Sequence, residues 1–317
     1  MDPDDSAKTA FITPFGLYQF RYMPFGLKGA PATFQRLVDY ILNSLPYTRA
    51  YLDDIIVFSN SFNEHLIHME QVLTRLRRAG LTLNVEKCKL VQTQTEYLGH
   101  KIGNVIIDPL REKTEKIRNA GVPTTKKKVR SFLGLAGYYQ KFIPNFATIA
   151  TPLTELTRKG AVDPIKWSQI EQNAFDTLKD ALCSERILRN PDFSLPFVLQ
   201  TDSSDYGLGA VLSQNFEDGE HPITFISRKL SKAELNYSTI EKECLAIIFA
   251  VKKLDYYLYG RKFKMITDNN PLRWLNIMKP DNRRLARWAL CLQEYDFEIK
   301  SRPGTDNGNA DGMSRLE

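Results

Sequence analysis

The sequence predicts a multidomain protein that combines α/β and α+β folds. Its 317 residues are 43% hydrophobic and 25% charged, the composition of a globular protein with room for two or three ordinary cores. Strand-like and helix-like stretches alternate over the first 110 residues and again after residue 183. The segment between them is helical and rich in lysine and arginine. The chain therefore divides into a mixed N-terminal part, a basic helical middle and a mixed C-terminal part.

The N-terminal part begins with short strands followed by helices. Residues 9–20 (TAFITPFGLYQF) are aromatic and β-branched, with Pro and Gly between them, as in short strands joined by turns. Apolar residues at helical spacing predict helices over 30–45 and 61–80. Pro31 suits the first turn of the first helix, and Gly80 suits the end of the second.

A β-hairpin is predicted between these two helices. The stretch RAYLDDIIVFSN, residues 49–60, places two aspartates between two apolar runs. A hairpin of this pattern has the two carboxylates at its tip and presents Asp53 and Asp54 to solvent or to metal ions. Two adjacent carboxylates on one hairpin do not surround two metal ions, so a metal site here needs a further acid from elsewhere.

The middle segment carries most of the positive charge. Residues 111–160 hold eleven Lys and Arg against three Glu, a local charge of +8 in a chain of net charge +6. Helical periodicity runs through 124–143, 146–160 and 171–183, with Thr124 or Thr125 as the cap of the first helix. Such a segment is typical of a protein that binds a polyanion such as nucleic acid, but a solvated lysine-rich helix explains the charge equally well.

The C-terminal part has the order β-β-β-α-β-α-β. Three strands, a long helix over 238–260, a strand over 262–268, helices through Trp274 and Trp288 and a strand over 297–301 give a mixed sheet flanked by helices. Acidic residues lie at strand ends and on the helices beside them, where side chains distant in the sequence gather. They are Asp202, Glu243, Asp268 and Asp311.

Carboxylates brought this close repel one another unless divalent cations neutralise them. Two Mg²⁺ ions about 4 Å apart can activate water and stabilise the leaving oxygen of a phosphodiester. By spacing alone, however, four unrelated surface acids among 37 Asp and Glu remain the better explanation.

Other features narrow the class of protein. The four cysteines are far apart and include no CxxC pair, which argues against a zinc site and against a disulfide framework. The N-terminus lacks the pattern of a signal peptide, and no apolar stretch approaches about 20 residues. We therefore expect a soluble intracellular protein that does not enter membranes.

Eight stretches in order identify a family resemblance. They are FGLYQFRYMPFGLKGAPATFQRL, YLDDIIVFS, YLGHKI, KVRSFLGLAGYYQKFIPNFATIATPLTELT, QTDSSDYGLGAVLSQ, YSTIEKECLAIIFAVKKLDYYLYG, ITDNNPL and SRPGTDNGNADGMSR. Together they resemble the reverse transcriptase–ribonuclease H region of the Pol polyprotein of gypsy-type LTR retrotransposons, over essentially the whole chain.

The resemblance implies three domains: a partial reverse-transcriptase palm over 1–118, a basic helical thumb or connection over 119–182, and an RNase H-like domain over 183–317. The RNase H-like domain is expected to contain a mixed five-stranded sheet with flanking helices. The four acids of the C-terminal part then become the catalytic, metal-binding set for two Mg²⁺ ions, with Mn²⁺ as an alternative. Asp53 and Asp54 become polymerase metal ligands.

The resemblance also implies nucleic-acid contacts. A primer-contacting hairpin maps to Tyr97, Gly99 and His100, and the basic helix supplies phosphate contacts. These phosphate-contacting residues are Lys126, Lys127, Lys128 and Arg130. Tyr138 and Tyr139 are expected to pack rather than to stack on bases. The expected partners are RNA–DNA hybrids and primer–template nucleic acid, while the oligomeric state is left open.

In this family a further palm Asp precedes the segment with which this chain begins, and the fingers precede it as well. We therefore expect an N-terminally truncated fragment whose polymerase site is incomplete and whose ribonuclease H activity is retained. The alternative is a non-catalytic nucleic-acid-binding relic of the same element. The location expected from the family is the cytoplasm or a particle assembled there.

Overall fold

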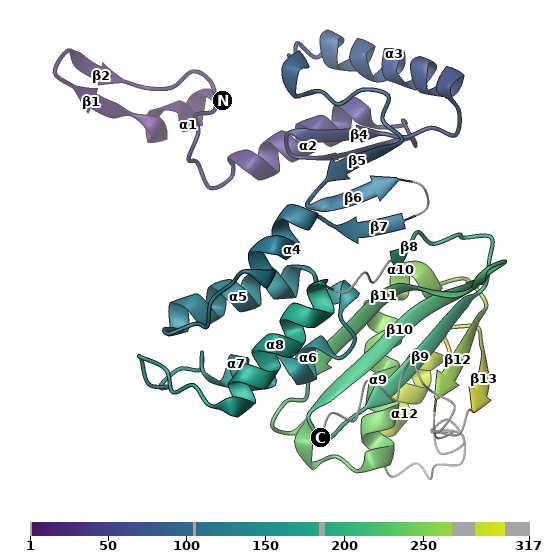
Figure 1. Ribbon diagram of the computed structural model, residues 1–317. Helices are drawn as coiled ribbons and strands as arrows, with labels where there is room; N and C mark the ends of the chain where they lie inside the picture. Colours follow the sequence, from purple (N-terminus) through teal and green to yellow (C-terminus); the bar gives the residue numbers. More distant parts are fainter. Residues whose placement is uncertain (1, 104–105, 184–187, 268–282, 302–317) are drawn as a thin grey trace. The chain divides into compact units, whose positions relative to one another are not determined.

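The computed structural model describes four stretches of the chain (Figure 1), which are residues 2–103, 106–183, 188–267 and 283–301. The chain separates into two compact units, an N-terminal unit of residues 1–97 and a C-terminal unit of residues 98–317. The division into three domains stays a prediction.

The N-terminal unit alternates short strands with two long helices, as the sequence predicts. Its elements are α1 (Pro3–Ser6), η1 (Ala7–Thr9), β1 (Phe11–Thr13), β2 (Gly16–Tyr18), α2 (Ala30–Leu42), β3 (Thr48–Tyr51), β4 (Asp54–Val57), α3 (Phe62–Arg78), η2 (Val85–Lys87) and β5 (Gln94–Tyr97). The strands β1 and β2 form one antiparallel hairpin, and β3 and β4 form another.

The core of this unit lies between α2, α3 and the β3–β4 hairpin. Its buried apolar side chains are Val38, Leu42, Leu45, Val72 and Leu76. Leu37, Leu66 and Leu73, which also fit the helical spacing, are exposed. Helix α3 begins after Ser61, whose hydroxyl accepts the Glu64 N–H at 3.3 Å. It ends before Gly80, which has a positive φ of 69°. The predicted bounds of this helix are therefore confirmed.

The C-terminal unit contains the basic helical segment and the larger sheet. Its elements are β6 (His100–Gly103), β7 (Ile106–Pro109), α4 (Arg111–Arg118), α5 (Lys126–Tyr138), η3 (Gln140–Phe142), α6 (Phe146–Ile149), α7 (Thr151–Glu155), α8 (Gln169–Cys183), β8 (Leu188–Arg189), β9 (Phe197–Ser203), β10 (Gly207–Phe216), β11 (Gly219–Lys229), η4 (Glu234–Asn236), α9 (Thr239–Lys253), α10 (Asp255–Leu258), β12 (Phe263–Thr267), α12 (Arg283–Leu292) and β13 (Phe297–Ser301).

The larger sheet is mixed and five-stranded, in the order β11-β10-β9-β12-β13 (Figure 1). The first three strands pair antiparallel, whereas β12 is parallel to both β9 and β13. This is the mixed sheet with flanking helices that the sequence predicts. The predicted helix around Trp274 lies outside the described residues.

Helices cover both faces of this sheet. Alternate residues of β10 point to opposite faces, so Ala210 and Leu212 pack with Ile247 and Val251 of α9. Val211 packs instead in a core formed largely by α5, α7 and α8. Thus the basic helical segment and the five-stranded sheet share one hydrophobic core.

At one side of this shared core, α6 packs directly on the sheet. The N–H of Ala147 donates to the Ser227 hydroxyl of β11 at 3.0 Å. A Cβ atom built on Gly209 would lie 2.7 Å from Oδ1 of Asn145, so the side chain of Asn145 occupies the space that any larger residue would need. Gly209 is also the residue of β10 that pairs with Asp202 of β9.

Candidate functional site: carboxylates of the larger sheet and the Asp-Asp hairpin

Two of the four predicted metal-binding acids come from β9 and α9. Asp202 is the next-to-last residue of β9 and is half-buried. Glu243 lies in the first half of α9 and is buried, with 7% of its surface exposed. The start of α9 is fixed by a capping box, in which Ser238 and Glu241 bind each other's backbone N–H groups. The strand and the capped helix therefore hold these two carboxylates on rigid elements.

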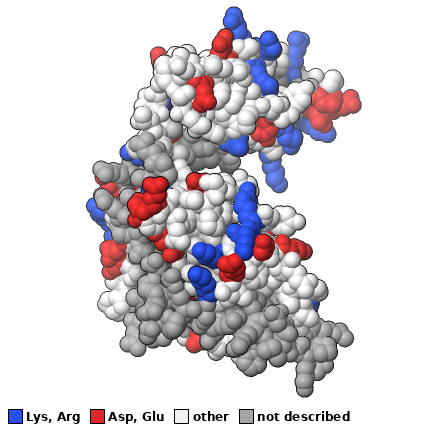
Figure 2. Space-filling view, turned by 90° about the vertical axis from the view of Figure 1, so that its right-hand side faces the viewer, with Lys and Arg blue, Asp and Glu red and all other residues white. Residues whose placement is uncertain are grey.

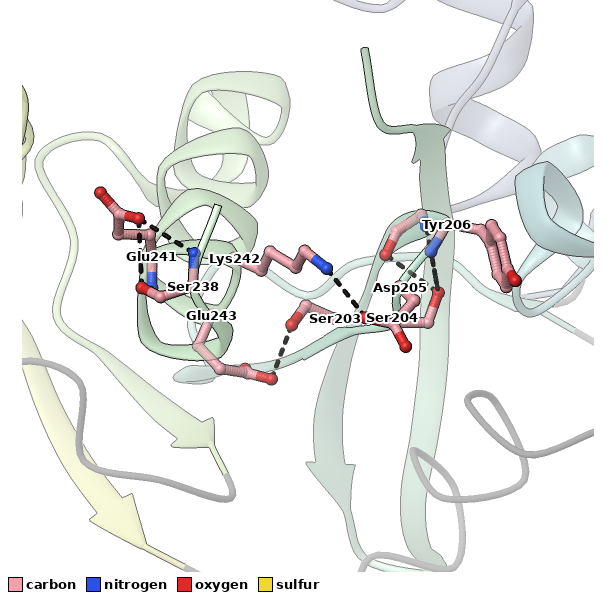
Figure 3. A network of polar contacts seen from close by, with 9 residues as sticks. Ser203, Ser204, Asp205, Tyr206, Ser238, Glu241, Lys242 and Glu243 are labelled. Carbon is pink, nitrogen blue, oxygen red and sulfur yellow. Dashed lines mark hydrogen bonds and ion pairs between the residues drawn. The ribbon is translucent and has the colours of Figure 1, made fainter. Parts of the chain in front are cut away.

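The end of β9 and the turn after it are bonded to α9 at two points, which Figure 3 shows together. The Ser203 hydroxyl, adjacent to Asp202, donates to Oε1 of Glu243 at 2.7 Å. The ammonium group of Lys242 reaches Oδ1 of Asp205 at 2.8 Å. Both bonds keep the strand end bearing Asp202 close to the helix that carries Glu243.

The charges around this network are unevenly exposed. The side chain of Lys242 is 10% exposed, whereas that of Asp205 is 84% exposed. The hydrogen bond and the positive charge of Lys242 lower the pKa of Asp205 below its ordinary value. Burial, with the charges of Glu243 and Glu241, raises the pKa of the Cys244 thiol to about 12, so this thiol stays protonated and unreactive at neutral pH.

The donor set fits a hard divalent cation. Carboxylate oxygens on a strand end and a buried helix position are the ligands that Mg²⁺ prefers. Asp268 and Asp311, which would complete the set, lie outside the described residues. Within the ranges that the structure describes, no group of three or more His, Cys, Asp or Glu residues comes together as a metal site.

The predicted Asp-Asp hairpin is present in the N-terminal unit. Tyr51 pairs with Asp54, so the two-residue tip is Leu52 and Asp53, and Asp54 is the first residue of β4 rather than part of the predicted tip. Both aspartates are exposed. Leu52 has a positive φ of 51°, which is unfavourable for a branched side chain. Its N–H donates to Oε1 of Gln35 on α2 at 2.7 Å.

Gln35 also binds the first strand of the hairpin, because its Nε2 donates to the carbonyl oxygen of Ala50 at 3.1 Å. One glutamine therefore fixes both the tip and the strand that leads to it. The charge of Asp54 also acts on Tyr97 of the same unit: burial first, and this charge second, raise the pKa of the Tyr97 hydroxyl.

The four basic residues of α5 differ in whether their side chains form hydrogen bonds within the protein. The ammonium of Lys126 donates to the Ala161 carbonyl, and Nη2 of Arg130 donates to the Thr157 carbonyl at 3.0 Å. The ammonium of Lys128 donates to the Thr124 hydroxyl at 3.2 Å. Lys127 is exposed.

Phosphate contacts by these four residues stay a prediction. The cap of α5 is Thr125, one of the two residues predicted for this role. On the face of the molecule that Figure 2 shows, Lys and Arg side chains and Asp and Glu side chains are both scattered among uncharged residues.

Gly99 and His100 belong to a turn that α5 holds from the side. The hydroxyl of Tyr139 donates to the carbonyl oxygen of Gly99 at 2.9 Å. Sequence patterns do not reveal this bond, nor those of Gln35 and Ser203, because each joins segments that are distant in the chain. The predicted packing role of Tyr139 is confirmed, since only 1% of its surface is exposed.

Within the described ranges, no helix is both long and apolar enough to span a bilayer.

Comparisons with known proteins agree on the family. Residues 1–102 match the family described as reverse transcriptase (RNA-dependent DNA polymerase). Residues 192–295 match the RNase H-like domain found in reverse transcriptase.

Curated relatives cover the chain from end to end. A retrovirus-related Pol polyprotein from transposon 297 of Drosophila melanogaster is 46% identical over 100% of this chain and 30% of the relative. The Pol polyprotein from transposon opus, also of D. melanogaster, is 41% identical over 100% of this chain and 33% of the relative. The Tf2-3 polyprotein of Schizosaccharomyces pombe is 39% identical over 98% of this chain and 24% of the relative. The chain thus spans a third or less of the length of these relatives.

Solved structures confirm the fold. The foamy viral protease-reverse transcriptase in complex with double-stranded DNA aligns with a TM-score of 0.82 at 24% identity, over 95% of this chain and 54% of that one. The foamy viral protease-reverse transcriptase in complex with an RNA/DNA hybrid gives a TM-score of 0.80 at 24% identity, over 95% of this chain and 42% of that one. With both family domains in order and Pol polyproteins as relatives, the chain belongs to the reverse transcriptase–ribonuclease H region of LTR-retrotransposon Pol polyproteins.

Proposed function

We propose that the C-terminal unit hydrolyses the RNA strand of RNA–DNA hybrids and that this activity depends on Mg²⁺. The observation that carries the proposal is that the end of β9, which bears Asp202, is joined to α9 by the 2.7 Å bond between Ser203 and Glu243. The match of residues 192–295 to the RNase H-like domain supports it.

Each residue has a distinct part in this proposal. Asp202 and Glu243 supply carboxylate oxygens to the metal site, and Asp268 and Asp311 are proposed to complete it. Bound metal supplies the acidity that ionises water and the charge that stabilises the departing 3′ oxygen. Ser203 fixes one Glu243 oxygen, and Lys242 holds the turn that follows Asp202. These contacts set the geometry before any substrate arrives.

The proposed substrate is a hybrid duplex, since one of the similar solved structures is a complex with an RNA/DNA hybrid. Selection of a hybrid relies on the 2′-hydroxyl groups of one strand and the overall shape of the duplex. The residues of α5 named above, led by the exposed Lys127, are proposed to hold backbone phosphates.

A second proposed activity belongs to the N-terminal unit. Residues 1–102 match the reverse transcriptase family, and the hairpin tip with Asp53 and Asp54 is fixed by Gln35. We infer that these aspartates serve RNA-directed DNA synthesis on a primer–template in the whole Pol protein. The Leu98–His100 turn would contact the primer strand.

The test of the proposed ribonuclease activity is cleavage of an end-labelled RNA annealed to DNA, in Mg²⁺, by the full chain. Asp202→Asn should abolish cleavage while its circular dichroism spectrum matches that of the wild type, and EDTA should abolish cleavage by the wild type. Asp218→Asn is the matched control, because Asp218 is a 56% exposed carboxylate that pairs with Arg189.

Two results would count against the proposal. Cleavage that survives in Asp202→Asn would show that the activity comes from another site or from a contaminant. If the folded wild type binds the hybrid without cutting it, the chain is the non-catalytic nucleic-acid-binding relic.

A further inference from the structure

The turn formed by Leu98, Gly99 and His100 is held by two consecutive tyrosines of the α5 end. The Tyr139 hydroxyl donates to the Gly99 carbonyl at 2.9 Å, and the Tyr138 hydroxyl donates to the Leu98 carbonyl. Forty residues separate the partners in each bond. The basic helix therefore fixes the backbone of a distant turn at two successive residues.

This turn has a backbone conformation that needs support. Leu98 and Gly99 both have positive φ, 45° and 73°, the combination found at the centre of type I′ turns. Leucine rarely adopts this conformation. A Cβ atom on Gly99 would lie 3.2 Å from Cε1 and from the hydroxyl oxygen of Tyr138, so Tyr138 also closes the space beside the turn.

The rings beside the turn form a stack. His100 lies against Tyr138 with ring centres 5.5 Å apart and planes 11° apart, and it meets the edge of Tyr139 at 5.6 Å. Burial, and to a smaller extent the positive charge of Lys141, lowers the pKa of His100 to about 4. The imidazole is therefore neutral at neutral pH and acts as a flat support for the Tyr138 ring.

The two tyrosines differ in exposure, which gives them different parts. Tyr139 is 1% exposed and belongs to the core that α5, α7 and α8 share with Val211 of the five-stranded sheet. Tyr138 is 52% exposed and lies at the surface beside the turn. One hydroxyl thus ties the turn to the shared core, while the other fixes it at the surface.

We propose that Tyr138 and Tyr139 are positioning residues, whose hydroxyls fix the Leu98–His100 turn so that it receives the 3′ end of a primer strand at one defined place in the C-terminal unit. This inference rests on the proposed binding of primer–template nucleic acid. It assigns to α5 a task apart from phosphate contact, namely to keep the turn in the left-handed conformation when nucleic acid is bound.

The test separates contact with the primer end from overall binding. The full chain is mixed with a primer–template whose primer ends in 2-aminopurine and whose far end carries a dye, in EDTA so that no hydrolysis occurs. The variants are Tyr138→Phe, Tyr139→Phe and the double variant, which keep the rings and remove only the hydroxyls. Tyr295→Phe is the control, because its hydroxyl donates to Asp255 Oδ1 at 2.6 Å in another part of the same unit.

The expected result is a selective loss at the primer end. Binding should change the 2-aminopurine emission with the wild type and with Tyr295→Phe. This change should shrink about two- to tenfold in the tyrosine variants, the effect of losing one hydrogen bond at each site. Affinity measured by dye anisotropy should change less than twofold.

Two outcomes would overturn the inference. The first is a 2-aminopurine signal unchanged in the double variant. The second is that signal and affinity fall together in the tyrosine variants and fall equally in Tyr295→Phe, which would indicate a general loss of structure. Failure of the proposed function would look different, because the wild type itself would then not bind the primer–template.

Discussion

Replacing Gly209 by alanine tests the close packing of α6 on the larger sheet. The new Cβ would lie 2.7 Å from Asn145 Oδ1, closer than real Cβ contacts, so the sheet and α6 must move apart or Asn145 must leave its place. Overpacking of this kind costs about 1–3 kcal/mol of unfolding free energy. Gly134→Ala makes the same chemical change on the exposed side of α5 with open space around it, and should stabilise the unit by about 0.5–1 kcal/mol.

The assay is urea denaturation followed by tryptophan fluorescence. All three tryptophans, Trp167, Trp274 and Trp288, belong to the C-terminal unit, so the emission reports on that unit alone. Asn145→Gly removes the clashing amide at a residue whose φ of 51° suits glycine. In the double variant Gly209→Ala with Asn145→Gly, at least about 1 kcal/mol of the loss should be recovered.

Strictly additive effects of the two substitutions, or a Gly209→Ala protein as stable as the wild type, would refute this packing. Recovery in the double variant would show that the Asn145 side chain directly contacts the Gly209 position, on the strand that pairs with Asp202.

Further predictions concern metal, salt and acid. Ser203→Ala removes the bond to Glu243 and should weaken Mg²⁺ binding about tenfold in calorimetry, and an unchanged constant would remove Ser203 from this role. Lys127→Ala should lower the slope of log affinity against log salt for a hybrid duplex by up to about one unit, and an unchanged slope would mean that Lys127 meets only solvent. Burial and the charge of Lys141 lower the pKa of His100 to about 4 in the folded protein. The neutral imidazole should therefore stabilise the fold fully above about pH 6.5, and this stabilisation should be lost as the pH falls toward 4. Allowing for solvent screening, urea denaturation should show a loss of about 1–3 kcal/mol in this window that His100→Phe lacks; equal losses in both proteins would contradict it.

Patterns within one segment predicted most of the fold. The Asp-Asp hairpin, the three antiparallel strands and the capped helix that carries Glu243 each follow from hydrophobic period and turn chemistry within one continuous stretch of the chain. Glu243 borders the apolar stripe of α9 in the sequence and is buried in the structure, as this position predicts. The starts of α3, α5 and α9 lie close to the predicted ones, and Ser61, Thr125 and Ser238 cap them. The stretches 146–160 and 238–260, each predicted as one helix, are each divided into two shorter helices.

Patterns of this kind could not predict contacts between segments that are distant in the sequence. The bonds of Gln35 to the hairpin tip, of Tyr139 to Gly99 and of Ser203 to Glu243 join residues 17 to 40 positions apart. None of these side chains differs in the sequence from an ordinary surface or core residue. The role of Gly209 is equally hidden, because it depends on an asparagine that arrives from another element. The four-acid site required the family resemblance, since spacing alone favoured unrelated surface acids.

The core shared by the basic helices and the five-stranded sheet bears on how this region can be inherited or shortened. Val211 and Phe225 of the sheet belong to the same buried cluster as Phe132 and Phe175 of the helices. A protein cut near residue 183 would therefore expose both sheet residues to water and would tend to aggregate. A transposon that lost the helices and kept the sheet would face the same difficulty. The two segments therefore depend on each other for burial, and a mutation that opens this core in either segment should destabilise both.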